Sequence, residues 1–141
     1  MNFIVIFHAG IATGTILLIA AIGEIFTERA GIKNLGVEGM MLLGAMAGFK
    51  IAYVTGNAWL GLLAAILAGG LLSLLHGLVT ISFQADQTVS GLSLTFLGTG
   101  MALVLGEGLT GLTTATIPNF SVPFISQIPY VGQVLSPITT C

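Results

Sequence analysis

Ser73 and His76 come nearest to a catalytic arrangement in this sequence. Three residues apart, they would share one face of a helix, where an imidazole could act as base toward a serine nucleophile. No acidic or thiol residue lies nearby to orient the imidazole. Side chains at this spacing usually reflect packing or hydrogen bonding between helices, and we interpret the pair in that way. Polar residues inside a membrane are nonetheless costly, so either His8 or His76 could line an aqueous path.

A dinucleotide-binding pattern, G-x-G-x-x-G, matches residues 106–111. That site needs a following crossover helix and an acidic residue about twenty positions further on, and no acidic residue follows Glu107. A phosphate-binding loop needs a glycine directly before its lysine, which neither Lys33 nor Lys50 has. The two histidines show no metal-ligand spacing, and the single cysteine, Cys141, cannot join a cluster. We therefore expect no enzyme, no metal and no cofactor.

Charge is concentrated between Glu24 and Glu38, a stretch that holds five of the eight charged residues. Such density calls for water or close pairing. Gly31, Gly36 and Gly39 are expected to interrupt the helix here, beside Asn34. Broken helix ends expose backbone N–H and C=O groups that can serve a polar pathway, although charged connecting loops are also common at membrane faces.

The composition indicates that the solvent of this chain is lipid. Of 141 residues, 55% are hydrophobic and 6% are charged, about a quarter of the charge of a soluble domain. Three basic residues cannot neutralise a row of phosphates, which excludes nucleic acid as a partner.

Four runs are long and apolar enough to cross a hydrocarbon core about 30 Å thick as helices. They lack the alternation of barrel strands and are twice as long. The predicted fold class is therefore all-α membrane, a polytopic bundle of about four transmembrane helices in a single membrane domain. The expected spans are residues 3–23, 37–54, 59–83 and 89–106.

The remainder, residues 107–141, contains four prolines and is predicted to be a Pro-rich external loop. The basic residues Arg29 and Lys33 place the first connection in the cytoplasm by the positive-inside rule. The N-terminus would then lie outside, and the loop at residues 84–88 would be cytoplasmic.

Small residues recur at four-residue spacing on three of the predicted spans. This spacing lets helices approach closely and is common in any membrane bundle. The sets are Gly10 and Gly14; Gly44 and Gly48; and Gly61, Ala65 and Gly69.

Two long blocks of sequence resemble a known family. GEIFTERAGIKNLGVEGMMLLGAMAGF, residues 23–49, and GGLLSLLHGLVTISFQADQTVSGLSLTFLGTG, residues 69–100, are similar in order and content to permeases of the branched-chain amino acid superfamily of ABC transporters. They are most similar to its nucleoside and simple-sugar subgroup. The resemblance covers residues 10–137.

The resemblance implies a plasma-membrane subunit that forms part of the translocation pathway of an importer. Its implied partners are a second permease subunit, two cytoplasmic ATP-binding subunits, an extracellular or periplasmic solute-binding lipoprotein and the lipid bilayer. Permeases of this family are about twice as long, and their cytoplasmic coupling segment follows the point where this sequence stops. We therefore expect an N-terminal half of a permease, natural or shortened, that could not respond to ATP hydrolysis by itself.

The resemblance also suggests which residues lie at the cytoplasmic side of the pathway. Glu28 could pair with Arg29 or Lys33, and Asn34 could bond to freed backbone at the helix break. The expected site residues are Glu24, Glu28, Arg29, Asn34, Glu38, Gln87 and Ser90.

Two other functions fit parts of the sequence. A small four-span proton-coupled exporter would have this length, but it usually needs an ionisable residue deep in a span, whereas Glu24 and Glu107 fall at span ends. A membrane assembly protein without transport activity is favoured only by the faces of small residues.

Overall fold

The computed structural model describes residues 3–116. Four α-helices follow one another, and each is long and apolar enough to cross a membrane. They are α1 (Phe3–Arg29), α2 (Val37–Thr55), α3 (Ala58–Gly77) and α4 (Gln87–Gly106). One π-helical turn, η1 (Leu78–Ser82), continues α3. The predicted all-α membrane fold is confirmed.

The described chain divides into two units, and the division falls inside α1 at Gly23. The first unit contributes the described residues 3–22, which form the apolar part of α1. The second unit contains residues 23–116 of the described range, and all contacts discussed below belong to it. The predicted external loop is described only up to residue 116, where residues 107–116 form turns and irregular backbone; its remainder lies outside the described residues.

The first helix is longer than expected, because it continues through Glu24, Glu28 and Arg29. The connection between the first two spans was expected to begin at Glu24, whereas irregular backbone begins only after Arg29. A charged side chain ends a membrane span but not a helix, since its backbone N–H and C=O groups still pair with neighbouring turns. The irregular connection is confined to residues 30–36.

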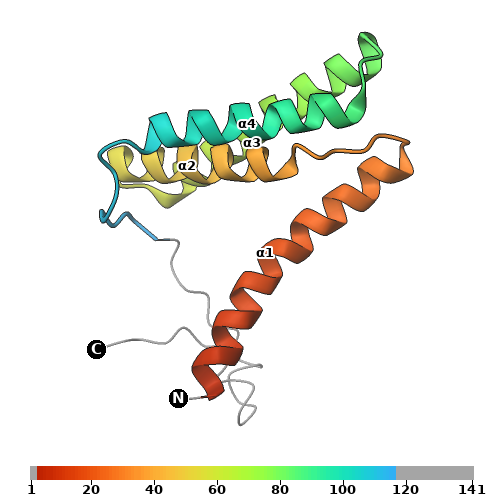
Figure 1. Ribbon diagram of the computed structural model, residues 1–141. Helices are drawn as coiled ribbons and strands as arrows, with labels where there is room; N and C mark the ends of the chain where they lie inside the picture. The colour runs from red at the N-terminus through yellow and green to blue at the C-terminus, as the bar shows by residue number, and fades with distance from the viewer. Residues whose placement is uncertain (1–2, 117–141) are drawn as a thin grey trace. The chain divides into compact units, whose positions relative to one another are not determined.

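In the second unit α2 is the central helix, against which both α3 and α4 pack. Figure 1 shows α2 and α4 side by side and running in the same direction. The helix that connects them in the sequence, α3, runs in the opposite direction. A small apolar core, in which Met40, Leu43, Leu72 and Leu94 are buried, lies where the three helices meet.

Glycine allows α2 and α3 to approach closely. A Cβ added at Gly61 would lie 2.7 Å from the carbonyl oxygen of Gly48, and one added at Gly44 would lie 3.1 Å from that of Ala65. Both contacts are tighter than ordinary Cβ packing, so only glycine fits without separating the helices. The predicted small-residue faces of α2 and α3 are therefore confirmed as a packing interface, whereas the role of Gly10 and Gly14 stays a prediction.

A second close approach joins α2 to α4 and was not expected. A Cβ at Gly39 would lie 2.6 Å from the carbonyl oxygen of Leu94, and Gly98 of α4 faces the backbone of Gly39. Gly39 lies within α2 and is buried, so the expectation that it interrupts the helix was wrong. It is a glycine because the neighbouring backbone leaves no room for a side chain.

Candidate functional site

The connection between α1 and α2 begins with a glycine in the left-handed region. Gly31 has φ of 83°, and its N–H donates to the carbonyl oxygen of Glu28 at 2.9 Å. This conformation ends a helix by turning the chain away while still pairing its last carbonyl groups. The predicted interruption at Gly31 is therefore present.

Asn34 organises the connection from inside. Its side chain is 7% exposed, and its Oδ1 accepts from the N–H of Gly36 at 3.1 Å, just before α2 begins. Its own backbone N–H donates to Glu24 Oε1 of α1 at 3.0 Å. Its Nδ2 contacts the sulfur of Met40 at 3.6 Å, a weak bond. Asn34 therefore bonds to freed backbone at the break, as expected, and Glu24 ties the end of α1 to it.

Gln87, the first residue of α4, holds the same connection from the other side. Its Oε1 accepts from the N–H of Lys33 at 2.8 Å, and its Nε2 donates to the carbonyl oxygen of Gly31 at 3.2 Å. One amide thus satisfies a donor and an acceptor of irregular backbone, which would otherwise need water. This explains why a glutamine, with both functions on one side chain, suits the position.

Thr95, eight residues after Gln87 on α4, adds a third point of attachment. Its Oγ1 donates to the carbonyl oxygen of Leu35 at 3.0 Å. Gly91 allows this approach, since a Cβ there would lie 2.9 Å from the backbone nitrogen of Leu35. We call Glu24, Asn34, Gln87 and Thr95 the junction network. Thr95 was not predicted, because nothing in sequence links it to a loop sixty residues earlier.

The remaining charged residues of this region do not belong to the junction network. Glu28, Arg29 and Glu38 are exposed. Glu38 lies in the first turn of α2, where a carboxylate is favourable to the helix dipole. The suggested pairing of Glu28 with Arg29 or Lys33 stays a prediction.

A second polar contact lies between α3 and α4. His76 is 3% exposed, and its Nδ1 lies 3.2 Å from Ser90 Oγ. Its other ring nitrogen, Nε2, is buried without a hydrogen-bond partner among residues 3–116. Ser73, the neighbour considered from spacing alone, is exposed. The histidine thus pairs across two helices with a residue that the sequence had placed at the cytoplasmic turn.

The junction network and the pair of His76 and Ser90 differ in what their hydrogen bonds hold. The junction network satisfies irregular backbone, and its members fix the position of the connection rather than present reactive groups. Each group also leaves one buried polar atom without a partner among the described residues, Glu24 Oε2 in the junction network and His76 Nε2 beside Ser90, which is unusual in native structures. Within the described part of the chain, no group of three His, Cys, Asp or Glu side chains could hold a metal ion.

Comparison with known proteins decides the family. Residues 6–139 match the family described as branched-chain amino acid transport system / permease component. The chain belongs to this family. The match includes both sequence blocks noted above and every member of the junction network. As a member of this permease family with four spanning helices, the chain is a multi-pass membrane protein.

Three relatives have names that state a transported solute. TsgC13 of Haloferax volcanii, provisionally named a glucose ABC transporter permease protein, is 41% identical over 89% of this chain and 40% of its own length. The guanosine ABC transporter permease protein NupQ of Bacillus subtilis is 36% identical over 84% of this chain and 40% of its own length. The nucleoside ABC transporter permease protein NupC of Lactococcus lactis is 32% identical over 85% of this chain and 41% of its own length.

The chain therefore spans about 40% of the length of the curated permeases that it matches. No solved structure matches it.

Proposed function

We propose that this chain forms part of the membrane domain of an ABC importer permease, within the translocation pathway for nucleosides or simple sugars. Membership of the permease family over residues 6–139 carries the proposal. The relatives named for glucose, guanosine and nucleosides support the solute class. The energy would come from two cytoplasmic ATP-binding subunits, and the solute from an extracellular or periplasmic solute-binding lipoprotein. A second permease subunit would complete the pathway.

The proposed orientation puts the N-terminus outside and the junction network on the cytoplasmic side. Arg29 and Lys33 support it, because basic residues favour cytoplasmic connections. In this orientation α2 and α4 begin at the cytoplasmic face, where Gln87 and Thr95 attach the connection to α4. A connection held at several points would move with α2 and α4 as one body during transport. The exposed residues Glu28, Arg29 and Glu38 are then available to water or to a partner subunit.

Uptake by cells tests this function. The gene for the native protein is deleted, and uptake of radiolabelled guanosine and glucose is compared with that of the parent and of the complemented strain. We expect deletion to remove high-affinity uptake of one of the two, and excess unlabelled nucleoside or sugar to compete for the restored uptake. Unchanged uptake of both solutes would reject the proposed solute class. Export that is abolished by a protonophore would favour the proton-coupled alternative.

A further inference from the structure

A cavity of about 470 Å³ lies between α3 and α4, beside the turn that joins them. This volume is within the range of small-molecule sites. Most of its wall is apolar, and its polar members are Asp86, Ser90 and Ser93. Asp86 is occupied as the cap of α4, since its Oδ1 accepts from the N–H of Val89 at 2.9 Å. Ser93 Oγ donates to its own helix at Val89. Ser90 is therefore the polar side chain of the wall that bonds outside its own helix.

Ser90 is hydrogen-bonded to the buried imidazole of His76, which is not itself part of the cavity wall. In either neutral tautomer, the bond to Ser90 uses Nδ1 and leaves Nε2 as a buried donor or acceptor without a partner in the described chain. A buried polar atom of this kind is costly, and the described residues hold two others, Glu24 Oε2 and Thr114 Oγ1. An ionisable residue inside a membrane, with its partner identified, is by default a hypothesis of function.

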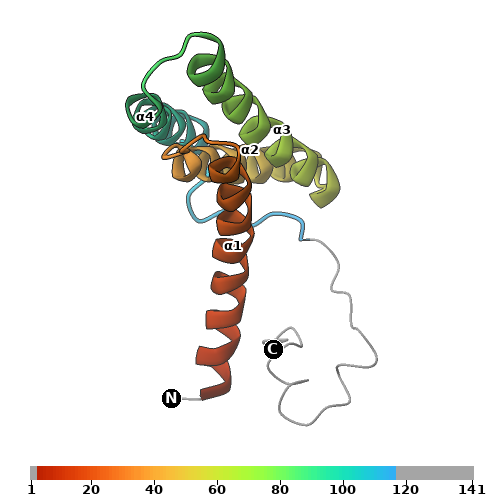
Figure 2. The same cartoon turned by 90° about the vertical axis from the view of Figure 1, so that its right-hand side faces the viewer.

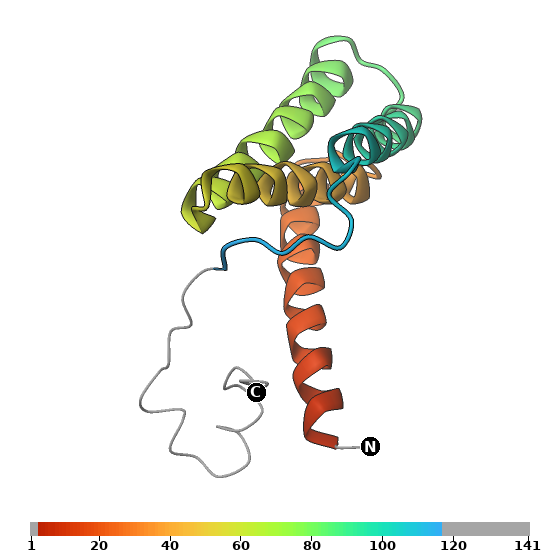
Figure 3. The same cartoon turned by 90° about the vertical axis from the view of Figure 1, so that its left-hand side faces the viewer.

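The arrangement of the helices allows this cavity to widen. Figures 2 and 3, in which α4 is seen nearly along its axis, show α3 slanting away from α4 beyond their joining turn. Each of them packs closely on α2, whereas they contact each other little. In the described part of the chain, His76 to Ser90 is the one side-chain hydrogen bond that joins α3 to α4. Separation of α3 from α4 would break this bond and loosen the apolar core that holds Leu72 and Leu94.

The helix also changes its geometry at this level. The turn after His76 is π-helical, with the N–H of Phe83 donating to the carbonyl oxygen of Leu78 at 3.3 Å. Thr80, which is buried, donates through Oγ1 to the carbonyl oxygen of His76 at 2.8 Å. This π-helical turn forms the C-terminal end of the helix, where π-turns are known to occur.

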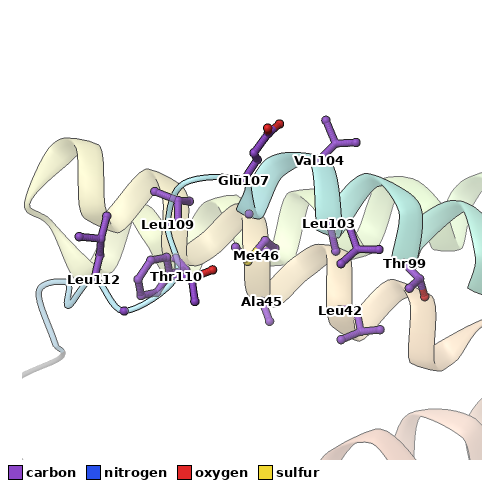
Figure 4. Close-up of a pocket in the computed structure, with 14 residues that line it drawn as sticks. Leu42, Ala45, Met46, Thr99, Leu103, Val104, Glu107, Leu109, Thr110 and Leu112 are labelled. Carbon is purple, nitrogen blue, oxygen red and sulfur yellow. The ribbon is translucent and has the colours of Figure 1, made fainter.

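A larger cavity within residues 3–116 is a weaker candidate. It measures about 900 Å³ and lies between α2, the end of α4 and the turn that follows. In Figure 4 the carboxylate of Glu107 points away from Met46 and Ala45, which lie on the opposite side of this site. Among residues 3–116, neither wall contains a buried polar atom that lacks a partner, but the smaller cavity has a wall residue, Ser90, that is hydrogen-bonded to a side chain carrying such an atom.

We propose that the cavity between α3 and α4 is a contact site for the transported solute, in which Ser90 and His76 bind hydroxyl groups of a sugar ring. The inference rests on the proposed function. Glucose and guanosine, the solutes named for two relatives, share a hydroxylated ring whose groups both donate and accept hydrogen bonds. Separation of α3 from α4 frees Ser90 and gives Nε2 access to such a hydroxyl. The apolar faces of Leu75 and Val79 would contact the carbon side of the ring.

Cysteine accessibility in the complete native transporter tests the site. With Cys141→Ser as background, Ser90→Cys is compared with Ser73→Cys, an exposed serine of α3 outside the cavity wall. Vesicles are treated during ATP-driven turnover with a water-soluble methanethiosulfonate, with and without saturating guanosine or glucose. We expect the transported solute to slow modification at residue 90 at least threefold and to leave the rate at residue 73 unchanged. No protection of residue 90 by the solute, or equal protection at both positions, would overturn the proposal.

Kinetics provide an independent measurement that does not depend on the cysteine variants. Loss of one neutral hydrogen bond to the solute corresponds to about a threefold to tenfold change in affinity. We expect Ser90→Ala to raise the KM for uptake by this factor, and His76→Gln, which keeps hydrogen-bonding groups, to raise it less than His76→Leu. Ser73→Ala should leave KM unchanged. An unchanged KM in Ser90→Ala, with normal amounts of protein in the membrane, would contradict solute contact. Absence of ATP-dependent uptake in the unmodified transporter would instead reject the proposed function itself.

Discussion

The side chain of Gln87 accepts a hydrogen bond from the backbone N–H of Lys33 at 2.8 Å, across 54 residues of sequence. The same amide donates to the carbonyl oxygen of Gly31 at 3.2 Å. One side chain of α4 thus holds the connection that leads from α1 into α2. The contact of Gln87 with Gly31 and Lys33 thus joins the two sequence blocks, residues 23–49 and 69–100, that resemble transport permeases.

Replacement of Gln87 by leucine should weaken the junction network without creating a cavity. Two hydrogen bonds would be lost at a partly exposed position, where water can replace them, so we expect a cost of about 1 kcal/mol in the free energy of unfolding. Thermal denaturation in detergent, followed by fluorescence-detected size exclusion, measures the change. Thr88→Val, at an exposed neighbour on α4, is the control and should have no effect. An equal shift in both variants would show that the Gln87 bonds do not stabilise the fold.

Substitutions at Asn34 and Glu38 compare a buried side chain with an exposed one. Asn34→Leu removes the acceptor of the Gly36 N–H inside the protein, and an unsatisfied buried group costs about 1–3 kcal/mol. Glu38→Gln changes an exposed side chain and should leave stability within about 0.5 kcal/mol. In the full-length transporter we expect Asn34→Leu to reduce uptake severalfold. Uptake equal to that of the parent in both variants would show that the region is only a connector.

Glycine packing predicts opposite effects at two positions of α3. Gly61→Ala places a methyl group 2.7 Å from the backbone of Gly48 and should destabilise by about 1–3 kcal/mol, because the helices must separate. Gly70→Ala meets nothing within 4 Å and should stabilise by about 0.5–1 kcal/mol, because alanine favours the helix. Thermal midpoints of the two variants, measured side by side, check the difference. A higher midpoint for Gly61→Ala than for Gly70→Ala would show that α2 and α3 do not pack through this contact.

The proposed orientation can be checked by labelling from each side of the membrane. In the Cys141→Ser background, Glu28→Cys should react with a membrane-impermeant maleimide only when the reagent reaches the cytoplasmic side. Asn119→Cys should react from outside. Intact cells and inverted vesicles give the two exposures. The reverse pattern would place the N-terminus in the cytoplasm and the junction network outside.

The number and class of helices were predictable from the sequence, because a run of about 20 apolar residues has one stable form in a bilayer. The end of α1 was not predictable in this way, since Glu24 and Glu28 mark where a span ends rather than where helical hydrogen bonding stops. Gly39 was assigned to a helix break because a glycine alone does not reveal which backbone faces it. Here the facing backbone is that of Leu94 and Thr95, more than fifty residues away.

The candidate site was predictable only in its local part. Asn34 was expected to bond to the backbone beside it, and it does. Gln87 and Ser90 were singled out through family resemblance, but their partners, Lys33 and His76, depend on how α4 lies against the rest of the second unit. Spacing along one helix favoured Ser73 as the neighbour of His76, because periodicity reports on one helix and not on contacts between two.

ATP-driven uptake in proteoliposomes tests the central claim most directly. The native permease that contains this sequence is reconstituted with its ATP-binding subunits and solute-binding lipoprotein, and accumulation of radiolabelled guanosine or glucose is followed with a protonophore present. The account predicts accumulation that requires ATP inside the compartment equivalent to the cytoplasm and that the protonophore leaves unchanged. Accumulation that needs a proton gradient, or no ATP-dependent accumulation of either solute, would contradict it.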